Sequence, residues 1–157
     1  MEGDLDAAEP LYEESLALAR GLGDHENVQI GLQNLARVSI GRGSGDRARA
    51  MLLEILTIAE ANGSKRAGRS VLEVAAGLAA HVGELESATR FYGVTQAQLE
   101  QTGYHRDPAD EAFLSPLIAR ALEGLGATAF AAAETAARAL SYEDALAEAR
   151  AWLESRS

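Results

Sequence analysis

The sequence predicts an all-α fold of about eight helices, and three observations predict it. Segments that open on a glycine and an acidic residue recur along the chain and align over about fifteen residues. Apolar residues recur at intervals of three and four, and no stretch alternates apolar and polar residues long enough for a strand. Glycine-containing breaks separate the helical stretches. The 157 residues suffice for one domain with its own core.

The recurring segments indicate a repeated unit of about forty residues. They begin at Gly3, Gly45 and Gly83, so the starts differ by 45 − 3 = 42 and 83 − 45 = 38 residues. In this alignment a small residue follows each glycine at the same distance, namely Ala8, Ala50 and Ala88. Glycine and an acid before an amphipathic run are typical of a turn followed by a charged first helical turn. Each unit is therefore expected to be a pair of helices.

The expected helices of these units span about 4–21, 25–41, 46–61, 65–82 and 84–101. The breaks between them are Gly21-Leu22-Gly23-Asp24, residues 41–45, Asn62-Gly63-Ser64 and Gly83. The expected buried face of 25–41 consists of Val28, Leu32, Leu35, Ala36 and Ser39, and that of 65–82 consists of Leu72, Ala75, Ala76 and Ala79. The second face is small for a core, which favours close helix packing over a ligand-lined groove.

The last third of the chain departs from the repeat. Asp107 followed by Pro108 predicts a helix start with an aspartate cap and proline in the first turn. Pro116 would remove a hydrogen bond inside that helix, so we expect a short turn near 108–114 and a new helix at about 116–124. Further helices are expected over 127–138 and after Ser141. We assign residues 1–103 to the repeats, the first one incomplete, and 104–157 to capping helices of the same domain.

The two-helix unit resembles the tetratricopeptide repeat, in the long version found in large bacterial signalling ATPases. The residues that carry this resemblance are Leu35-Ala36, Ser39 and Gly45-Asp46 in one unit, and Ala75-Ala76, Ala79 and Gly83-Glu84 in the next. The end of the chain resembles the tail of LuxR-type or adenylate-cyclase-like multidomain regulators, through Arg90-Phe91-Tyr92-Gly93, Ala129-Phe130-Ala131-Ala132-Ala133 and Arg138-Ala139-Leu140-Ser141. The resemblance implies a tetratricopeptide-like solenoid of helical hairpins, a right-handed superhelix, that senses or scaffolds within a larger regulator.

Charge and composition argue against several classes of function. With 14 Lys and Arg against 24 Asp and Glu, the formal net charge is −10, so direct binding of nucleic acid is not expected. The chain has no cysteine for disulfides or thiolate metal sites. No uncharged stretch approaches the roughly twenty apolar residues that cross a bilayer, and the acidic first residues do not resemble a signal peptide. We therefore expect a cytoplasmic protein that does not enter membranes.

The sequence offers no constellation for catalysis, cofactor binding or metal binding. His25, His81 and His105 stand far apart, and none forms a pair at helical ligand spacing. The glycine-rich stretch 41–45 lacks both the dinucleotide fingerprint and the phosphate-loop lysine, which favours an inter-helix turn. We expect a protein that is not an enzyme and that uses no cofactor.

A binding surface is the remaining candidate, because the first helix of each pair lines the concave side of helical repeats. The polar or uncovered residues there are Ile30, Gln33, Asn34, Arg37, Arg66, Arg69, Ser70 and Glu73. Amide and guanidinium groups at such positions hydrogen-bond a peptide backbone or a terminal carboxylate. The alternative is that these residues form an ordinary solvated face. The prediction is a non-catalytic module for protein–protein or intramolecular contacts, as the tail of a larger signalling or transcriptional regulator.

The first expected helix lacks a partner helix before it, which leaves Leu5, Leu11 and Leu18 as a candidate association face. Either this chain is a piece of a longer protein, which we favour, or two copies meet at that face as a homodimer. Two other functions stay open at this point. One is a small-molecule sensor whose effector lies between the repeats or against the alanine-rich helix 127–138, and the other is a free-standing homo-oligomeric adaptor.

Overall fold

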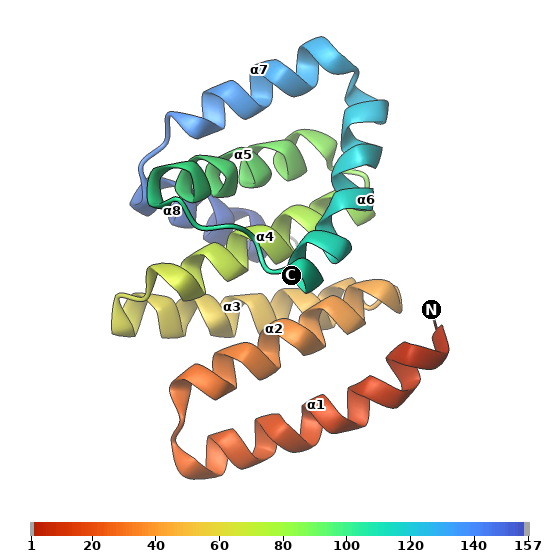
Figure 1. Cartoon of the computed structure of the whole chain (residues 1–157), viewed down its shortest axis with the longest axis vertical. Helices are drawn as coiled ribbons and strands as arrows, with labels where there is room; N and C mark the ends of the chain where they lie inside the picture. Colours follow the sequence, from red (N-terminus) through yellow and green to blue (C-terminus); the bar gives the residue numbers. More distant parts are fainter. Residues whose placement is uncertain (1, 156–157) are drawn as a thin grey trace. The chain divides into compact units, whose positions relative to one another are not determined.

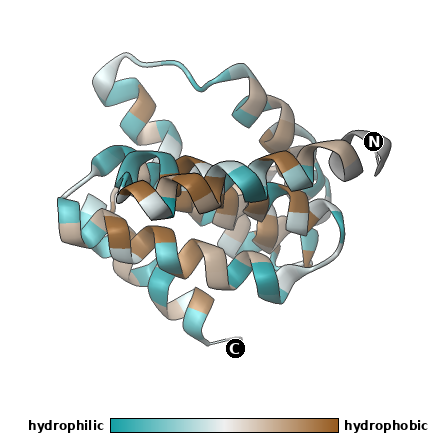
Figure 2. Cartoon of the chain, turned by 90° about the horizontal axis from the view of Figure 1, so that it is seen from below, coloured by the Kyte–Doolittle hydropathy of each residue, from teal (hydrophilic) through white to brown (hydrophobic). Residues whose placement is uncertain are grey.

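The computed structural model describes the backbone of residues 2–155 and the side chains of residues 7–155. This part of the chain forms eight α-helices and no strand, so the all-α prediction is confirmed (Figure 1). The helices are α1 (Glu2–Leu22), α2 (His25–Gly41), α3 (Gly45–Asn62), α4 (Lys65–His81), α5 (Leu85–Thr102), α6 (Pro108–Leu125), α7 (Ala127–Arg138) and α8 (Tyr142–Glu154). Hydrophobic and hydrophilic residues share most helices, as the amphipathic pattern predicts (Figure 2).

A turn glycine follows each of the helices α1 to α5, and successive turn glycines are twenty residues apart. Gly23, Gly43, Gly63, Gly83 and Gly103 all have positive φ, a backbone conformation that glycine adopts without steric cost. At the first four turns the next amide donates back into the preceding helix, for example from Asp24 N to Ala19 O at 3.0 Å. These are the contacts of a Schellman motif. One helix and its turn therefore occupy twenty residues, and one hairpin occupies forty.

This spacing corrects the alignment of the second repeat. The turn glycine is Gly43, whereas Gly45 is the first residue of α3. Ala48 is wholly buried, as is Ala88 forty residues later, while Ala50 is exposed. The sequence alignment placed Gly45 in the turn because its acidic neighbour imitates the other starts, and it was therefore two residues out of register.

The first compact unit extends to Val71 and contains α1, α2, α3 and the first turns of α4. In it α2 packs against both α1 and α3 (Figure 1). The predicted face of α2 is buried: Val28, Leu32, Leu35, Ala36 and Ser39 are each less than 10% exposed. On α3 the partners in this core include Leu52, Ile55 and Leu56.

The second compact unit begins at Leu72 within α4, although the repeat spacing ends only at Gly103. Here α5 packs against α6, α7 and α8. The predicted small face of α4 is buried, with Leu72, Ala75, Ala76 and Ala79 at 0% exposure. A Cβ at Gly93 of α5 would lie 2.9 Å from the backbone oxygen of Glu134 in α7. Small residues therefore let the helices of this unit approach closely.

The expected break at Pro116 was wrong, because α6 runs without interruption from Pro108 to Leu125. Pro116 is exposed, so its ring meets solvent and not a neighbouring helix. The side chains of Leu114 before it and Ile118 after it are both buried within the second unit. We attribute the continuity to this burial on both sides, which offsets the roughly 3 kcal/mol that an interior proline costs. Among the residues described, no helix combines the length and the apolar character needed to span a membrane.

Candidate functional site

A row of polar side chains lies along α2 and meets the first turns of α4, within the first unit. Gln29 Nε2 donates hydrogen bonds to Gln33 Oε1 at 3.2 Å and to Ser70 Oγ at 3.3 Å. These three side chains are buried, and their mutual bonds satisfy polar groups that would otherwise be costly there. Arg66 Nη1 also lies 3.6 Å from Glu26 Oε1. Polar contacts therefore join the two helices.

All eight predicted surface residues lie on these two helices. Seven of them belong to the first unit, and we call these seven the α2–α4 polar face: Ile30, Gln33, Asn34, Arg37, Arg66, Arg69 and Ser70. Asn34, Arg37 and Arg69 are half-buried, and Arg66 is exposed. Arg37 Nη2 donates a hydrogen bond to Asn34 Oδ1, which holds the guanidinium beside the amide. The accessible groups of this face are therefore amide and guanidinium groups, while the side chains of Gln33 and Ser70 on the same face are buried.

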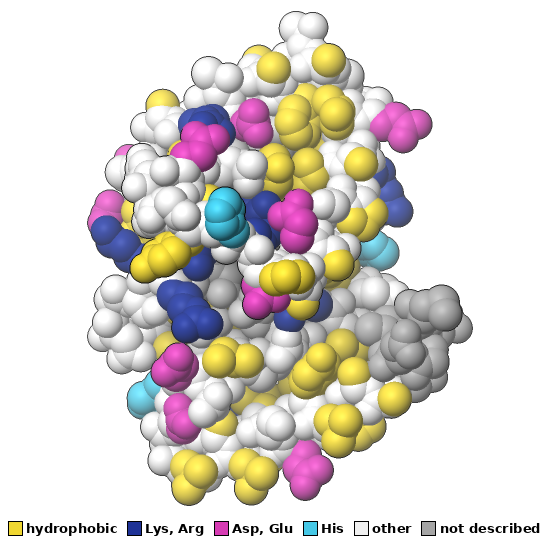
Figure 3. Space-filling view, viewed as in Figure 1, with side chains coloured by type: hydrophobic (Ala, Val, Ile, Leu, Met, Phe, Trp, Pro, Cys, Tyr) yellow, Lys and Arg dark blue, Asp and Glu magenta, His cyan; other side chains and the backbone are white. Residues whose placement is uncertain are grey.

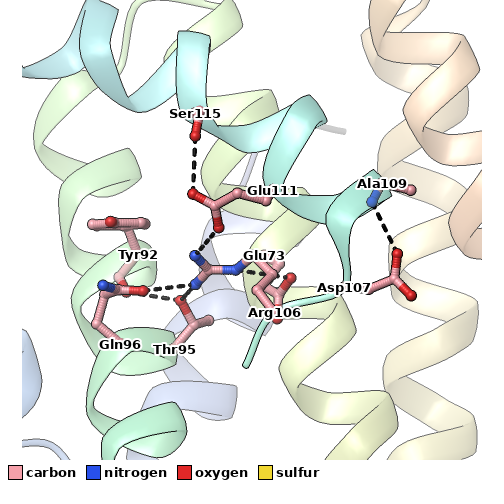
Figure 4. A network of polar contacts seen from close by, with 9 residues as sticks. All are labelled: Glu73, Tyr92, Thr95, Gln96, Arg106, Asp107, Ala109, Glu111 and Ser115. Atoms are coloured by element: carbon pink, nitrogen blue, oxygen red, sulfur yellow. Dashed lines mark hydrogen bonds and ion pairs between the residues drawn. The ribbon is translucent and has the colours of Figure 1, made fainter. Parts of the chain in front are cut away.

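Glu73, the eighth predicted residue, belongs to the second unit and has a different role. Its Oε2 lies 3.3 Å from Arg106 Nε, and the two side chains are only 7% and 5% exposed (Figure 4). A carboxylate that is buried against an arginine is not available to a surface ligand. Glu73 is therefore not part of an accessible surface, unlike Asn34, Arg37, Arg66 and Arg69.

Arg106 is the centre of the polar cluster that Figure 4 shows. Its Nη1 donates to Glu111 Oε2 at 3.0 Å, and its Nη2 donates to Thr95 Oγ1 at 3.0 Å and to Gln96 Oε1 at 2.9 Å. The guanidinium carbon lies 5.5 Å from the centre of the Tyr92 ring, within the range of a cation–π contact. The loop between α5 and α6 is thereby bound to α4, α5 and α6.

The electrostatics of this cluster indicate a structural role. Hydrogen bonds from Arg106 and then Ser115 lower the pKa of Glu111, and Ser115 Oγ lies 2.9 Å from Glu111 Oε1. Burial raises the pKa of the Tyr92 hydroxyl. Each nitrogen of the guanidinium lies beside a carboxylate or another acceptor, and the Arg106 side chain is only 5% exposed, so an anionic ligand in solvent does not reach it.

Sequence reasoning missed Arg106, although the sequence contains a signal for it. Glu73 is the only charged residue in the apolar stretch 71–80. A carboxylate enclosed on a buried helix face needs a cationic partner, because an unpaired buried charge is strongly unfavourable. That partner stands just before Asp107, whose side chain caps α6 by accepting a hydrogen bond from Ala109 N at 2.9 Å.

An open groove of about 440 Å³ lies between α1 and α3, above α2. Leu32 and Leu35 form its apolar floor. Ion pairs connect its two sides: Arg20 Nη1 lies 3.0 Å from Glu54 Oε2, and Arg47 Nη2 lies 2.8 Å from Glu13 Oε1. The remaining lining residues are Leu16, Ala17, Ala50 and Met51. The groove is therefore apolar inside and charged at its rim.

The predicted association face is exposed where the structure describes it. Leu11 is 64% and Leu18 63% exposed, and Leu22 on the same helix is 82% exposed. Hydrophobic side chains reach the surface along the lower edge of Figure 3, where Figure 1 places α1. Leu16, in contrast, packs toward Gly31 of α2. The side chain of Leu5 lies outside the described residues.

Other candidate positions are filled or exposed. At Gly77 a Cβ would lie 2.5 Å from the Phe113 ring, so the side chain of Phe113 fills the space beside this glycine of α4. His25, His81 and His105 are exposed. Among the side chains described, no group of three His, Asp or Glu is arranged to hold a metal ion.

Comparisons with known proteins give no relative. The chain matches no protein-family model, no curated protein and no solved structure.

Proposed function

We propose that the chain is a non-catalytic helical-repeat module that binds extended segments of protein on its α2–α4 polar face. The observation that carries the proposal is the row of amide and guanidinium groups from Gln33 through Asn34 to Arg37. An extended peptide presents unpaired N–H and C=O groups, and amide side chains complement both. Arg37 and Arg69 suit a terminal or side-chain carboxylate, because the planar guanidinium binds carboxylates through two parallel hydrogen bonds.

The regular turn spacing supports the repeat part of this proposal. Turns every twenty residues give a plan in which α2 and α4 occupy equivalent positions, forty residues apart. We place the module in the cytoplasm, within a larger signalling or transcriptional regulator that has its output in other domains. An immunoblot of source cells tests this placement: a band several-fold heavier than 16.6 kDa supports it, and a band at 16.6 kDa contradicts it.

A display library of random peptides tests the binding function. The full chain should enrich a common peptide pattern, and the double substitution Asn34→Ala and Arg37→Ala should weaken binding of the selected peptides by about tenfold. A matched control, Gln101→Ala with Arg120→Ala, removes one exposed amide and one exposed guanidinium elsewhere. Repeated selections that enrich no peptide, or an equal loss in the control, would contradict the proposal.

The groove between α1 and α3 favours a second candidate, a sensor for a small molecule. Its volume of about 440 Å³ lies in the range of ligand sites, roughly 300–1,000 Å³, and apolar residues line its floor. A ligand that binds the folded chain raises its stability in proportion to RT ln(1 + [L]/Kd). Thermal unfolding against a metabolite panel would reveal it, and Leu35→Phe, which narrows the groove, should abolish the shift.

A further inference from the structure

The helices α1, α3 and α5 follow one another at intervals of forty residues, and four equivalent positions on each form a face that we call the flanking face. On α3 it consists of Arg47, Ala50, Met51 and Glu54. Its equivalents are Ser87, Arg90, Phe91 and Val94 on α5, and Ala7, Pro10, Leu11 and Glu14 on α1. The four positions are spaced i, i+3, i+4 and i+7, so they share one side of each helix.

On α5 the flanking face is covered by α8. Phe91 is 1% exposed, and its ring meets the Trp152 ring edge-on at a centroid distance of 5.6 Å. Beside it, Arg90 Nη2 lies 2.7 Å from Glu148 Oε1. A helix therefore covers this face with an apolar anchor and an ion pair.

On α3 the flanking face turns toward α1 across the groove. Met51 lines the groove and is half-buried. Glu54 pairs with Arg20 of α1 at 3.0 Å, and Arg47 pairs with Glu13 of α1 at 2.8 Å. From one ion pair to the other, the sequence advances by seven residues on α1 and by seven residues on α3. The two helices therefore run parallel. As on α5, a helix of this chain therefore lies opposite the flanking face, and ion pairs connect the two helices at its edges.

On α1 the same four residues are exposed. Leu11, the equivalent of the buried Phe91, is 64% exposed, and Leu18, two turns further along the same side, is 63% exposed. Glu14 is the equivalent of Glu54, which receives an arginine from the helix opposite it. Isolated exposed leucines are common on proteins, but Leu11 occupies a position that a helix faces in the other two copies of the unit, at Met51 and at Phe91.

We propose that the flanking face of α1 binds an amphipathic α-helix of a partner protein. The partner places apolar side chains on Leu11 and Leu18 and a lysine or arginine beside Glu14. The net charge of −10 attracts such a basic helix and disfavours a second copy of this chain. The proposal concerns another surface than the α2–α4 polar face and does not depend on peptide binding there.

Two synthetic helical peptides of about 20 residues serve as probes, one built of Leu, Ala and Lys, the other with Glu in place of Lys. Fluorescence anisotropy with the full chain should show that the Lys peptide binds. Leu11→Asn or Leu18→Asn should weaken this binding by about tenfold, since a central apolar contact is lost. The control Leu122→Asn changes an exposed leucine of α6 (43% exposed) and should stay within about twofold.

Charge reversal gives the sharper test. Glu14→Lys should weaken binding of the Lys peptide by about tenfold, whereas Glu123→Lys on α6, which changes the net charge by the same amount, should leave it within about twofold. Equal effects of both reversals would overturn the proposal, because the attraction would then be unspecific. No binding of the Lys peptide up to about 1 mM would also overturn it. So would a dimer in analytical ultracentrifugation that Leu11→Asn dissociates, since the occupant would then be a second copy.

Discussion

Gln33 in the first unit and Glu73 in the second occupy equivalent positions, forty residues apart, and the two units satisfy them differently. Gln33 accepts a hydrogen bond from Gln29, a neutral amide one turn earlier on the same helix. Glu73 is paired with Arg106, which comes from a loop more than thirty residues later. Both side chains are buried, but the neutral amide accepts its hydrogen bond from its own helix, while the buried charge requires a dedicated counter-charge.

This difference distinguishes the proposed binding region in the first unit from a structural framework in the second. A neutral amide exchanges one hydrogen-bond partner for another at less cost than a buried charge loses its counter-charge, which is consistent with the proposed binding role of the first unit. Arg106, the cation of the ion pair in the second unit, connects a loop to three helices. Removing it leaves the Glu73 carboxylate buried with neither a counter-charge nor solvent around it. We therefore expect substitutions in the second unit to affect stability most, and substitutions in the first to affect binding most.

The largest effect is expected for Arg106→Ala. It leaves the Glu73 carboxylate buried without its cation, which costs about 3–5 kcal/mol in the free energy of unfolding. Urea unfolding at pH 7 measures this. Replacing both residues, Glu73→Leu with Arg106→Met, should recover most of the loss, because no charge then remains buried. The exposed Arg120→Ala should change stability by less than about 0.5 kcal/mol, and a similar loss there would refute the account.

Helix spacing gives the next prediction. Glu13 and Gly93 stand eighty residues apart at equivalent positions: Glu13 lines an open groove, while Gly93 lets α7 contact α5. Gly93→Ala would push a Cβ to 2.9 Å from the backbone oxygen of Glu134, so we expect a loss of about 1–3 kcal/mol. At Gly21 a Cβ meets nothing within 4 Å, and Gly21→Ala should instead gain up to about 1 kcal/mol. Thermal unfolding of both variants decides whether crowding or helix propensity dominates.

A smaller effect is expected for Gln29→Leu in the first unit. The substitution removes donors to Gln33 and Ser70, but leucine buries more apolar surface than the amide did. The net loss should be at most about 1.5 kcal/mol, the upper range for a neutral hydrogen bond. A loss as large as that of Arg106→Ala would show that the amide row is part of the framework, contrary to the comparison.

The fold was largely predictable from local patterns, because those patterns act over one or two turns. The five repeat helices and the buried faces of α2 and α4 follow from apolar spacing and glycine breaks. The register error at Gly45 arose because the alignment relied on the acidic residue after that glycine. The sequence already contains the glycines from Gly23 to Gly103 at intervals of twenty residues, and this regular spacing would have identified Gly43 as the turn residue. The error at Pro116 has another origin: a local cost was overcome by packing that only the tertiary structure provides.

The candidate site was predictable only in part, for the same reason. Asn34 and Arg37 follow from helical spacing, and the structure keeps them accessible. Glu73 shares that spacing, so the pattern assigned it to the same surface. Its partner Arg106 lies in a loop, where no periodicity relates it to a helix position. Long-range pairs of this kind are set by how the chain returns on itself, and periodicity does not encode that.

The smallest expected effect is a pH dependence confined to the Arg106 cluster. Hydrogen bonds from Arg106 lower the pKa of Glu111 below its ordinary value of 4.5. A carboxyl whose pKa is lower in the folded state adds stability above that ordinary value, and the contribution is lost as pH falls through the folded pKa. Because Glu111 is half exposed, with 52% of its side chain accessible, the contribution is screened by solvent.

Glu111→Gln should therefore be less stable than the parent chain at pH 7, and the difference should shrink as pH falls below the ordinary value of 4.5. Urea unfolding at several pH values measures both. Gln29→Leu supplies the contrast, since the amide row contains no group that titrates between those values, and its effect should stay constant with pH. A Glu111→Gln difference that persists unchanged at low pH would mean that the residue acts through packing and not through its charge, and the electrostatic distinction between the two units would then rest on Glu73 alone.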